Sequence, residues 1–435
     1  DAHRILFLAR LPTIALFAGL CVVMYWFVLW QTGSTMWALI AAALTGFCPN
    51  LMAHGRLATV DFALTFFSFT ATVLLLRLIE RPSVPTAILL GITAVAAPMS
   101  KVSGLILGPY LAIVIAGAFA LRRVEKPAQV WRGLAIAAIA GLLFFEGFTL
   151  AETRAAYARD QYPSTPRLLI PFAEYAANIR TIHQWYERAY TLPQFFLGEF
   201  SSTGWPQYYP VAFLLKTTFP AIILIVAALV VGVRLRSFAF WSLLLFVCVF
   251  FIAAATGHLA LGIRYVLPVY PFIYAATVIA LSATTLRRGA MAVIVALVVW
   301  HAVENLVAYP SYISYFNESI GSHKNADKFL IDSNLDWGQD LRRLDLWCRR
   351  NGISQITVHY FGGGDAEYEL SAKATVRRRP GPGLLPKGYF ALSRHFYRVS
   401  FLRNVWGIDY DSYLAASHAR YVTTIGGSIY VFRVD

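Results

Sequence analysis

The sequence is poor in charge and in cysteine. Only 14% of its 435 residues are charged and 58% are hydrophobic, whereas a soluble globular domain has about 25% charged and about 45–50% apolar residues. Such a chain cannot cover its surface with polar groups, so the composition excludes an ordinary soluble enzyme. It predicts a polytopic α-helical membrane protein, with the lipid membrane as its solvent. The cysteines are scattered and mostly lie in apolar runs, which argues against a disulfide framework. They are Cys21, Cys48, Cys248 and Cys348.

The first residues, DAHRILFLARLP, include neither an initiator methionine nor a secretory signal peptide. They are typical of the middle of a protein, and we expect further sequence upstream. The net charge of +14 is a feature of many nucleic-acid-binding proteins, but here the basic residues form short clusters between apolar segments. That arrangement is typical of membrane orientation signals. We therefore expect no nucleic-acid partner.

About ten segments are long and apolar enough to cross a bilayer, which takes about 20 residues per helix. The fourth is short and is interrupted by the sequence PMSKVSG. The segments lie near residues 11–31, 35–53, 60–79, 85–98, 104–121, 132–150, 217–233, 238–256, 266–284 and 289–308.

The loops between these segments differ in charge. If the ten spans alternate, every arginine cluster falls on one side, which the positive-inside rule makes cytoplasmic. The sequences HGRLATVD, MSKVSG and GHLALGIRY, the segment 151–216 and everything after residue 309 then lie on the opposite side. This predicts a multi-pass protein of the bacterial inner membrane with a periplasmic carboxyl-terminal domain. The clustered basic residues are Arg77, Arg81, Arg122, Arg123, Lys126, Arg132, Arg234, Arg236, Arg287 and Arg288.

The composition changes near residue 310, which divides the chain into a membrane domain, 1–309, and a small soluble α/β domain, 310–435. Within the first, segment 151–216 is rich in tryptophan and tyrosine, which favour the membrane–water boundary. We expect it to form amphipathic helices on the outer surface. In the second, DKFLID, GQDLRRLDLWCRRNG and ISQITVHYF predict strand, helix and strand in a parallel βαβ unit. YFALSR and SIYVFRV could add strands.

Ionisable residues near the membrane are the candidates for function. Asp61 stands at the start of a predicted helix, where Thr59 or Asp61 could instead serve as a helix cap. Lys101 follows a helix interrupted by Pro98 and Gly104. A lysine there suits a phosphate, although a lysine that snorkels to the interface is the alternative.

Lys216 and Arg264 each enter a later span on the same outer side as Lys101. Each alone could be an interfacial anchor. Together they place positive charge on the face where the orientation rule disfavours it, which indicates an anionic ligand such as a polyprenyl phosphate. Arg56 lies near this group in the predicted topology, and His258 precedes Arg264 by six residues.

The sequence DSNLDWGQDL, residues 332–341, is the most distinctive motif of the soluble part. Asp332, Asn334 and Asp336 alternate as in a calcium loop, but the glycine and the final ligand do not fit an EF-hand. Asp336 and Gln339 could begin a helix as a capping box, or the loop could bind a ligand at a strand end. FGGGD, residues 361–365, is a glycine-rich turn without a complete nucleotide-binding pattern.

Six stretches in order resemble bacterial family 39 glycosyltransferases. These are lipid-carrier-dependent enzymes of the GT-C fold, related to protein O-mannosyltransferases and aminoarabinose transferases. The resemblance covers nearly the whole chain, although Thr218 stands where the family usually has proline. The stretches are RILFLARLP, PNLMAHGRLATVDFALTFF, SKVSGLILGP, YYPVAFLLKTTFP, RYVLPVYPF and YFNESIGSHKNADKFLIDSNLDWGQDL.

The resemblance implies transfer of a sugar from a polyprenyl-phosphate donor to a protein, lipid or glycan acceptor on the periplasmic side. Asp61 matches an active-site aspartate, and Lys101, Lys216 and Arg264 match positions that would face the lipid phosphate. The residues expected to line the same cavity are His54, Arg56, His258 and Tyr265.

The family's main catalytic acid lies in the outer loop after the first transmembrane helix. The resemblance implies that the present sequence begins at the second helix, and we therefore expect that loop and its acid to lie outside it. Asp61 could assist through a divalent cation held together with that acid, although the sequence does not identify a metal. The alternative is a non-catalytic membrane subunit that keeps the GT-C scaffold for binding or assembly.

Overall fold

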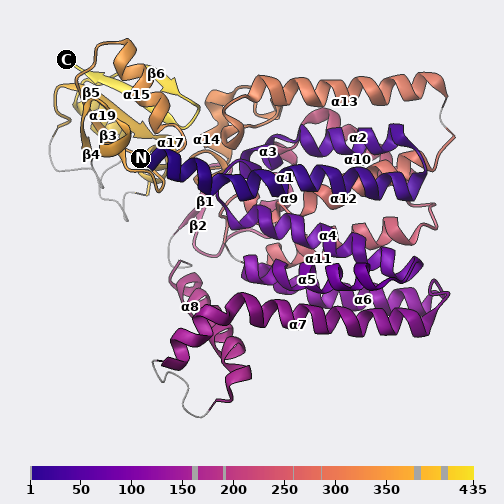
Figure 1. The fold of residues 1–435 in the computed structure, drawn as a ribbon. Helices are drawn as coiled ribbons and strands as arrows, with labels where there is room; N and C mark the ends of the chain where they lie inside the picture. Colours follow the sequence, from indigo (N-terminus) through magenta and orange to yellow (C-terminus); the bar gives the residue numbers. More distant parts are fainter. Residues whose placement is uncertain are drawn as a thin grey trace. The chain divides into compact units, whose positions relative to one another are not determined.

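The computed structural model describes residues 2–158, 165–189, 193–257, 259–285, 287–376, 384–402 and 410–435 (Figure 1). Within these ranges the chain divides into two compact units. Unit 1 comprises residues 1–192, 220–258 and 265–303, and unit 2 comprises residues 193–219, 259–264 and 304–435. Unit 2 therefore takes two short segments from the part of the chain that we assigned to the membrane domain. The predicted boundary at residue 309 stays a prediction.

Unit 1 is helical, and its long helices run side by side (Figure 1). Its helices are α1 (Ala2–Thr32), α2 (Thr35–Gly46), α3 (Pro49–Gly55), α4 (Val60–Glu80), α5 (Val84–Ser100), η1 (Val102–Ile106), α6 (Leu107–Ala120), α7 (Pro127–Ala158), α8 (Ile170–Ala189), α10 (Phe219–Gly232), α11 (Phe238–Thr256), α12 (Val269–Ser282) and most of α13 (Arg288–Ala308).

The apolar helices confirm a polytopic membrane protein, but not the predicted number of ten spans. Six helices of the described chain are long and apolar enough to cross a bilayer, and there are up to eight spans if each of two bent helix pairs counts as one. The bends are 63° between α2 and α3, and 119° between α9 (Tyr208–Lys216) and α10. The predicted spans at 85–98 and 266–284 are α5 and α12, which have 17 and 14 residues. Both are shorter than the roughly 20 residues that a straight span needs.

Helix α12 forms the centre of unit 1. Every residue from Val269 to Leu281 is buried, as expected for a helix that is apolar on all sides. Phe272 stacks on Phe246 of α11 with ring centroids 3.6 Å apart, and it meets Phe69 of α4 edge to face at 5.3 Å. These aromatic contacts tie the later helices to the early ones that carry Asp61.

Small residues let α5 and α7 approach closely. A Cβ atom at Gly91 would collide with the backbone of Ala137 and Gly141. Such close backbone contacts are a common way to pack helices in membranes. The contact fixes the position of α5, whose far end carries Lys101.

Unit 2 begins with a hairpin and a short helix, followed later by a mixed sheet. The hairpin joins β1 (Gln194–Phe196) and β2 (Glu199–Ser201) and was not predicted within segment 151–216. In that segment α8 is the one described helix of the amphipathic kind that we expected, and its location on a membrane surface stays a prediction. Besides α9, the helical elements of unit 2 include η4 (Tyr312–Ser314), η5 (Glu318–Ile320), η6 (His323–Asn325), α14 (Ala326–Phe329), η7 (Asp332–Asn334), α15 (Leu341–Arg350), α16 (Ala366–Glu369), α17 (Arg394–Val399) and α19 (Tyr410–Ala416).

The sheet has five strands in the order β4-β3-β5-β7-β6. Strand β3 pairs in parallel with β4 and β5, whereas β7 pairs antiparallel with β5 and β6. This confirms a small α/β domain at the carboxyl terminus. The strands are β3 (Gln355–His359), β4 (Lys373–Val376), β5 (Gly388–Ser393), β6 (Arg420–Ile425) and β7 (Ile429–Val434).

The first strand predicted for this domain is absent from the structure. Residues 326–329 form the short helix α14, and the carboxylate of Asp327 lies between Arg394 and Arg398 of α17. The predicted βαβ unit at residues 327–360 is therefore wrong in its first element. Helix α15 and strand β3 are as expected, and the parallel partners of β3 follow it in the sequence.

Candidate active site

A break in the helical backbone after α5 positions Lys101. The backbone of Lys101 is extended (φ −158°, ψ 137°), so α5 ends there and η1 begins. A side chain at Gly104 would collide with the backbone of Ala97 and Pro98, so glycine is required for the chain to fold back. The hydroxyl of Tyr175, in α8, donates to the carbonyl of Pro98 at 2.9 Å. The carbonyl of Pro98, in the last turn of α5, therefore has a partner, as a broken helix at membrane depth requires.

Asp61 lies in the first turn of α4 and pairs with Lys101. The Lys101 Nζ donates to Asp61 Oδ1 at 2.5 Å. Thr59, the residue before the helix, makes no side-chain capping hydrogen bond. The sequence left open whether the Asp61 carboxylate caps the helix or has a functional role. In the structure this carboxylate forms an ion pair with Lys101. The helix N-terminus further stabilises its negative charge.

The two partners differ in exposure. The side chain of Lys101 is 15% exposed and that of Asp61 is 3% exposed. A buried carboxylate thus holds a lysine whose side chain is only partly exposed. This arrangement differs from a snorkelling lysine, whose ammonium would be surrounded by water.

Two tyrosines complete this part of unit 1. The Lys101 Nζ lies 3.9 Å from the ring centroid of Tyr265, a distance typical of a cation–π contact. The Tyr265 hydroxyl is 3.1 Å from that of Tyr186 in α8. Four separate segments (α4, the α5 break, the turn before α12, and α8) therefore bring Asp61, Lys101, Tyr265 and Tyr186 together.

His54 and Arg56 lie in the connection that precedes Asp61. His54 is buried in the last turn of α3, and Arg56 is the residue that ends this helix. Both predicted cavity residues are therefore near Asp61 in sequence and belong to unit 1, and their place in the cavity stays a prediction. His258 lies outside the described residues.

Lys216 belongs to unit 2, where its side chain is fully buried. Its Nζ donates to the carbonyls of Ile313 at 2.6 Å and Asn334 at 2.7 Å. The Asn334 side chain in turn donates to the Tyr208 hydroxyl at 2.9 Å and accepts from the backbone N–H of Ile263 at 3.0 Å. These bonds join three of the sequence motifs. The predicted contact of Lys216 with a lipid phosphate stays a prediction.

Arg264 also belongs to unit 2 and stacks on the DSNLDWG loop. Its guanidinium carbon is 4.7 Å from the ring centroid of Trp337. Gly262 has a φ of +103°, and a side chain there would collide with Ser333. The hydroxyl of Ser333 donates to the carbonyl of Leu261. Residues 261–264 therefore fit tightly against residues 332–337.

Asp332 and Asp336 shape this loop and do not cap α15 in the predicted way. Helix α15 begins at Leu341 after Asp340, so the predicted capping box of Asp336 and Gln339 is wrong. The carboxylate of Asp336 instead accepts from the Gly338 N–H at 2.9 Å and the Ser393 hydroxyl at 2.6 Å. Burial raises the pKa of Asp336 to about 7, and the nearby carboxylates of Asp340 and Asp332 add to the rise.

His395 lies behind Asp332. Its Nδ1 accepts from the Asp332 backbone N–H at 3.1 Å, and burial lowers the pKa of His395 to about 4. Its ring also stacks on Phe361, with ring centroids 3.9 Å apart. The backbone of Asp332 itself is left-handed, with a φ of +60°. Sequence reasoning gave no role to His395, because this histidine lies 63 residues from its partner.

The glycine-rich turn FGGGD follows β3 as predicted. A side chain at Gly362, where φ is +129°, would collide with the backbone of Trp337 and Gly338. Beyond it a cavity of about 580 Å³ opens at the carboxyl end of β3, the usual position of ligand crevices in α/β sheets. Its lining includes Tyr360, Asp365 and Glu367.

A divalent cation does not fit the residues that the structure describes. They include no group of three or more histidine, cysteine, aspartate or glutamate side chains that could hold a metal. Asp61, the one carboxylate predicted to contact a metal, already pairs with an ammonium group. Magnesium and calcium require several oxygen ligands, so we derive no step through a metal.

Comparison with models of known protein families gives a match to the early part of the chain. Residues 2–154 match the family model of the dolichyl-phosphate-mannose-protein mannosyltransferases. This range includes both Asp61 and Lys101, and the match confirms the predicted resemblance to GT-C glycosyltransferases over about a third of the chain. Comparison with curated protein sequences finds no match.

Solved structures give weaker similarities. The oligosaccharyltransferase AglB from Archaeoglobus fulgidus, in complex with an inhibitory peptide and a dolichol-phosphate, is 13% identical with a TM-score of 0.43, over 99% of this chain. The chain spans only 63% of the length of that protein. ArnT from Cupriavidus metallidurans, bound to undecaprenyl phosphate, is 12% identical with a TM-score of 0.42, over 97% of this chain and 84% of ArnT.

Proposed function

We propose that the protein is a membrane glycosyltransferase that takes its sugar from a polyprenyl-phosphate carrier, with Lys101 binding the carrier phosphate. The observation that carries the proposal is the Asp61–Lys101 pair, which lies inside the range matched by the family model. The name of that family describes a dolichyl-phosphate sugar as donor and a protein as acceptor. We take from it the donor class alone, because no residue of this chain identifies the acceptor.

Transfer of a glycosyl group breaks the bond between the anomeric carbon and a phosphate oxygen. Negative charge develops on that phosphate as it leaves, and an ammonium held in a fixed position stabilises the charge. In this proposal Lys101 does so, because its side chain is partly exposed and its ammonium is fixed by Asp61 and by the ring of Tyr265. Pairing with one carboxylate oxygen is compatible with phosphate binding, since an ammonium has three N–H donors.

Asp61 then acts as a positioning residue. Its carboxylate is almost fully buried beneath Lys101, so its contact is with the lysine and not with the sugar. A buried carboxylate costs less free energy when an opposite charge pairs with it, and the pair holds the ammonium in one place. The earlier prediction that Asp61 itself is a catalytic carboxylate stays open beside this role. The family resemblance implies that a second carboxylate acts as the general base that accepts the acceptor's proton.

The proposal includes the side of the membrane. The arginine clusters are proposed to face the cytoplasm, which places Lys101 and the carboxyl-terminal sheet domain on the periplasmic side of a bacterial inner membrane. Arg264 is proposed as a second contact for the carrier phosphate, since its guanidinium suits phosphate.

The test is transfer by the full-length protein in proteoliposomes. The protein is incubated with a panel of radiolabelled polyprenyl-phosphate sugars and a membrane extract as acceptor source. We expect one sugar to enter the acceptor fraction, and we expect Lys101→Met to abolish this. Lys126→Met, a lysine substitution in the exposed turn before α7, is the matched control and should transfer normally. Carrier binding without transfer from any sugar would instead support the non-catalytic membrane subunit.

A further inference from the structure

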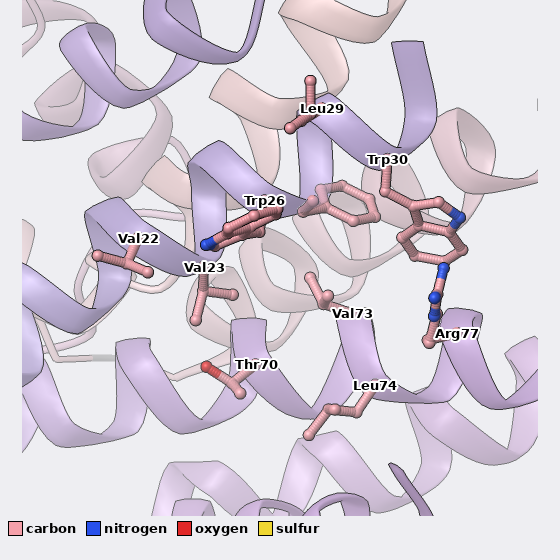
Figure 2. Close-up of a pocket in the computed structure, with 10 residues that line it drawn as sticks. Val22, Val23, Trp26, Leu29, Trp30, Thr70, Val73, Leu74 and Arg77 are labelled. Atoms are coloured by element: carbon pink, nitrogen blue, oxygen red, sulfur yellow. The ribbon is translucent and has the colours of Figure 1, made fainter. Parts of the chain in front are cut away.

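An apolar groove of about 510 Å³ runs between α1 and α4 (Figure 2). Neither Asp61 nor Lys101 is among its lining residues. Its lining residues recur every three or four positions, so each helix contributes one face. Along α4 the far end of the groove is Arg77, sixteen residues beyond Asp61, which corresponds to about 24 Å of helix. The residues used below are Val22, Trp26 and Trp30 of α1, and Thr70, Val73 and Arg77 of α4.

The walls of the groove suit a hydrocarbon chain. Trp26 is 62% exposed and Val22 is 55% exposed, and both point into the groove in Figure 2. In a helix that crosses a bilayer, such side chains meet lipid and not water. The groove therefore offers an acyl chain more apolar contact than a smooth helix surface would.

The positive charge lies at one end of the groove. The guanidinium of Arg77 lies 5.0 Å from the ring centroid of Trp30, which fixes its position at the end of the α1 face (Figure 2). The remaining lining of the groove carries no ionisable side chain. An apolar channel that ends in one cation matches an amphiphile with a single anionic head.

A second, polar cavity of about 550 Å³ continues from the same helix ends. Its lining includes Gln31, the residue after Trp30, and Arg81, four residues after Arg77. Together with Arg77, five arginines face two glutamates in these two cavities, so a net positive field covers this end of unit 1. The charged side chains of the polar cavity are Arg81, Arg122, Arg123, Arg236, Glu80 and Glu125.

We propose that an anionic glycerophospholipid binds here, with one acyl chain between α1 and α4 and its phosphate at Arg77. Basic pockets beside transmembrane helix ends are a recurring site for anionic lipid head groups, and arginine matches the geometry of a phosphate. The site is separate from the proposed carrier site at Lys101. It does not rest on the proposed transferase activity, and its test uses no sugar donor.

The test is lipid binding to the delipidated full-length protein, measured by native mass spectrometry and by the melting temperature. The probes are palmitoyl-oleoyl phosphatidylglycerol and phosphatidylcholine, which share their acyl chains and differ in head-group charge. We expect the wild-type protein to bind phosphatidylglycerol more tightly and to gain melting temperature from it. Arg77→Gln should weaken phosphatidylglycerol binding about tenfold, which corresponds to about 1.4 kcal/mol. It should weaken phosphatidylcholine binding less, because the choline ammonium of that lipid already offsets the charge of its phosphate.

Two further variants separate the head-group and chain contributions. Arg234→Gln removes an exposed arginine outside both cavities and should bind both lipids as the wild type does. Val22→Trp fills the groove at an exposed position and should weaken the binding of both lipids. Equal losses of phosphatidylglycerol affinity in Arg77→Gln and Arg234→Gln would overturn the proposal. The lipid would then respond to the net positive charge of the protein and not to a specific contact with Arg77.

Two more results would also overturn it. One is equal affinity of the wild-type protein for the two lipids. The other is a spontaneous disulfide between two copies of a Val22→Cys variant, which would identify a second copy of the chain as the occupant of the groove. A folded Val22→Trp protein with unchanged lipid binding would exclude the groove as the site of the acyl chain.

Discussion

Replacing Asp336 with asparagine should change how the stability of the carboxyl-terminal domain depends on pH. Burial raises the pKa of Asp336 to about 7 from an ordinary value of 3.8. Between these values the folded chain holds a proton that the unfolded chain has lost. Stability therefore falls as the pH rises through this window. Asparagine has no such proton, and its amide oxygen can accept from Gly338 as the carboxylate does.

The size of the effect follows from the shift. One pKa unit corresponds to about 1.36 kcal/mol, so from pH 5 to pH 8 a folded-state pKa near 7 removes roughly 2–3 kcal/mol of stability. The difference in stability between Asp336→Asn and the wild type should therefore shift by that amount in favour of the variant. His395 and Asp327 also titrate with shifted pKa values, but both remain in each protein and cancel in the comparison.

The assay is amide hydrogen exchange in detergent, followed by mass spectrometry, on peptides that cover β5 and β7. Opening free energies of these strands are compared between the two proteins at pH 5, 6, 7 and 8, with correction for the intrinsic exchange rates. A difference that stays constant across this range would refute the reasoning, because Asp336 would then titrate alike in both states. Thr424→Ser, on the neighbouring strand β6, gives the baseline for a change without a buried carboxylate.

Five other substitutions, one of them a control, test the remaining parts of the structure. Asp327→Asn should lower stability by about 3–5 kcal/mol, because it removes the partner of the buried Arg394, and chemical denaturation in detergent would measure this. Burial would raise the pKa of Asp327, but Arg394 and Arg398 lower it below the ordinary pKa of an aspartate. The stability that the ionised Asp327 contributes should therefore be lost as the pH falls below that ordinary pKa. Acid titration of the wild-type protein would show this loss. Gly262→Ala should lower the free energy of unfolding by about 1–3 kcal/mol, because φ is +103° there and Ser333 occupies the space of the new side chain. Gly352→Ala is the control: its φ is also positive but the space around it is open, so it measures the cost of the positive φ alone. Lys216→Met should lower the melting temperature through loss of the bonds to Ile313 and Asn334, and an unchanged melting temperature with weaker carrier binding would favour the predicted phosphate contact. Asp61→Asn should reduce sugar transfer and carrier-phosphate affinity together, since the lysine would be less well positioned, and unchanged turnover would exclude Asp61 from the mechanism.

The helical part of the fold was largely predictable from hydropathy. Each of the ten predicted apolar segments coincides with a helix or a bent helix pair, because long apolar runs have few alternatives in lipid. The break at Lys101 was also predicted, since Pro98 and Gly104 are local signals. The break between α9 and α10 was not predicted, although Pro220, in the first turn of α10, is a local signal for the start of a new helix.

The soluble part was less predictable because long-range contacts decide it. The stretch DKFLID was predicted to be a strand from its local composition. In the structure Asp327 instead pairs with Arg394 and Arg398, which lie 67 and 71 residues later. An ion network of this kind is invisible to a local pattern, and it outweighs a weak preference for strand.

In the candidate site, too, local sequence signals were predictable and long-range contacts were not. Asp61 and Lys101 were each identified from their own surroundings, but the bond between residues 40 positions apart could not be read from either. Tyr186 and Tyr175 were missed, because segment 151–216 contains many aromatic residues and no spacing distinguishes these two. Trp337 was part of a recognised motif, but its stacking with Arg264 depends on the folded loop.

Sugar transfer by Lys101 variants tests the central claim most directly. Single-turnover transfer from the active polyprenyl-phosphate sugar is compared among wild type, Lys101→Arg and Lys101→Met under saturating acceptor. Loss of a positioned charge that stabilises a leaving group costs about 10²–10³-fold in rate, so Lys101→Met should fall by at least about 100-fold, with partial activity retained in Lys101→Arg. Transfer by Lys101→Met at the wild-type rate would contradict the account.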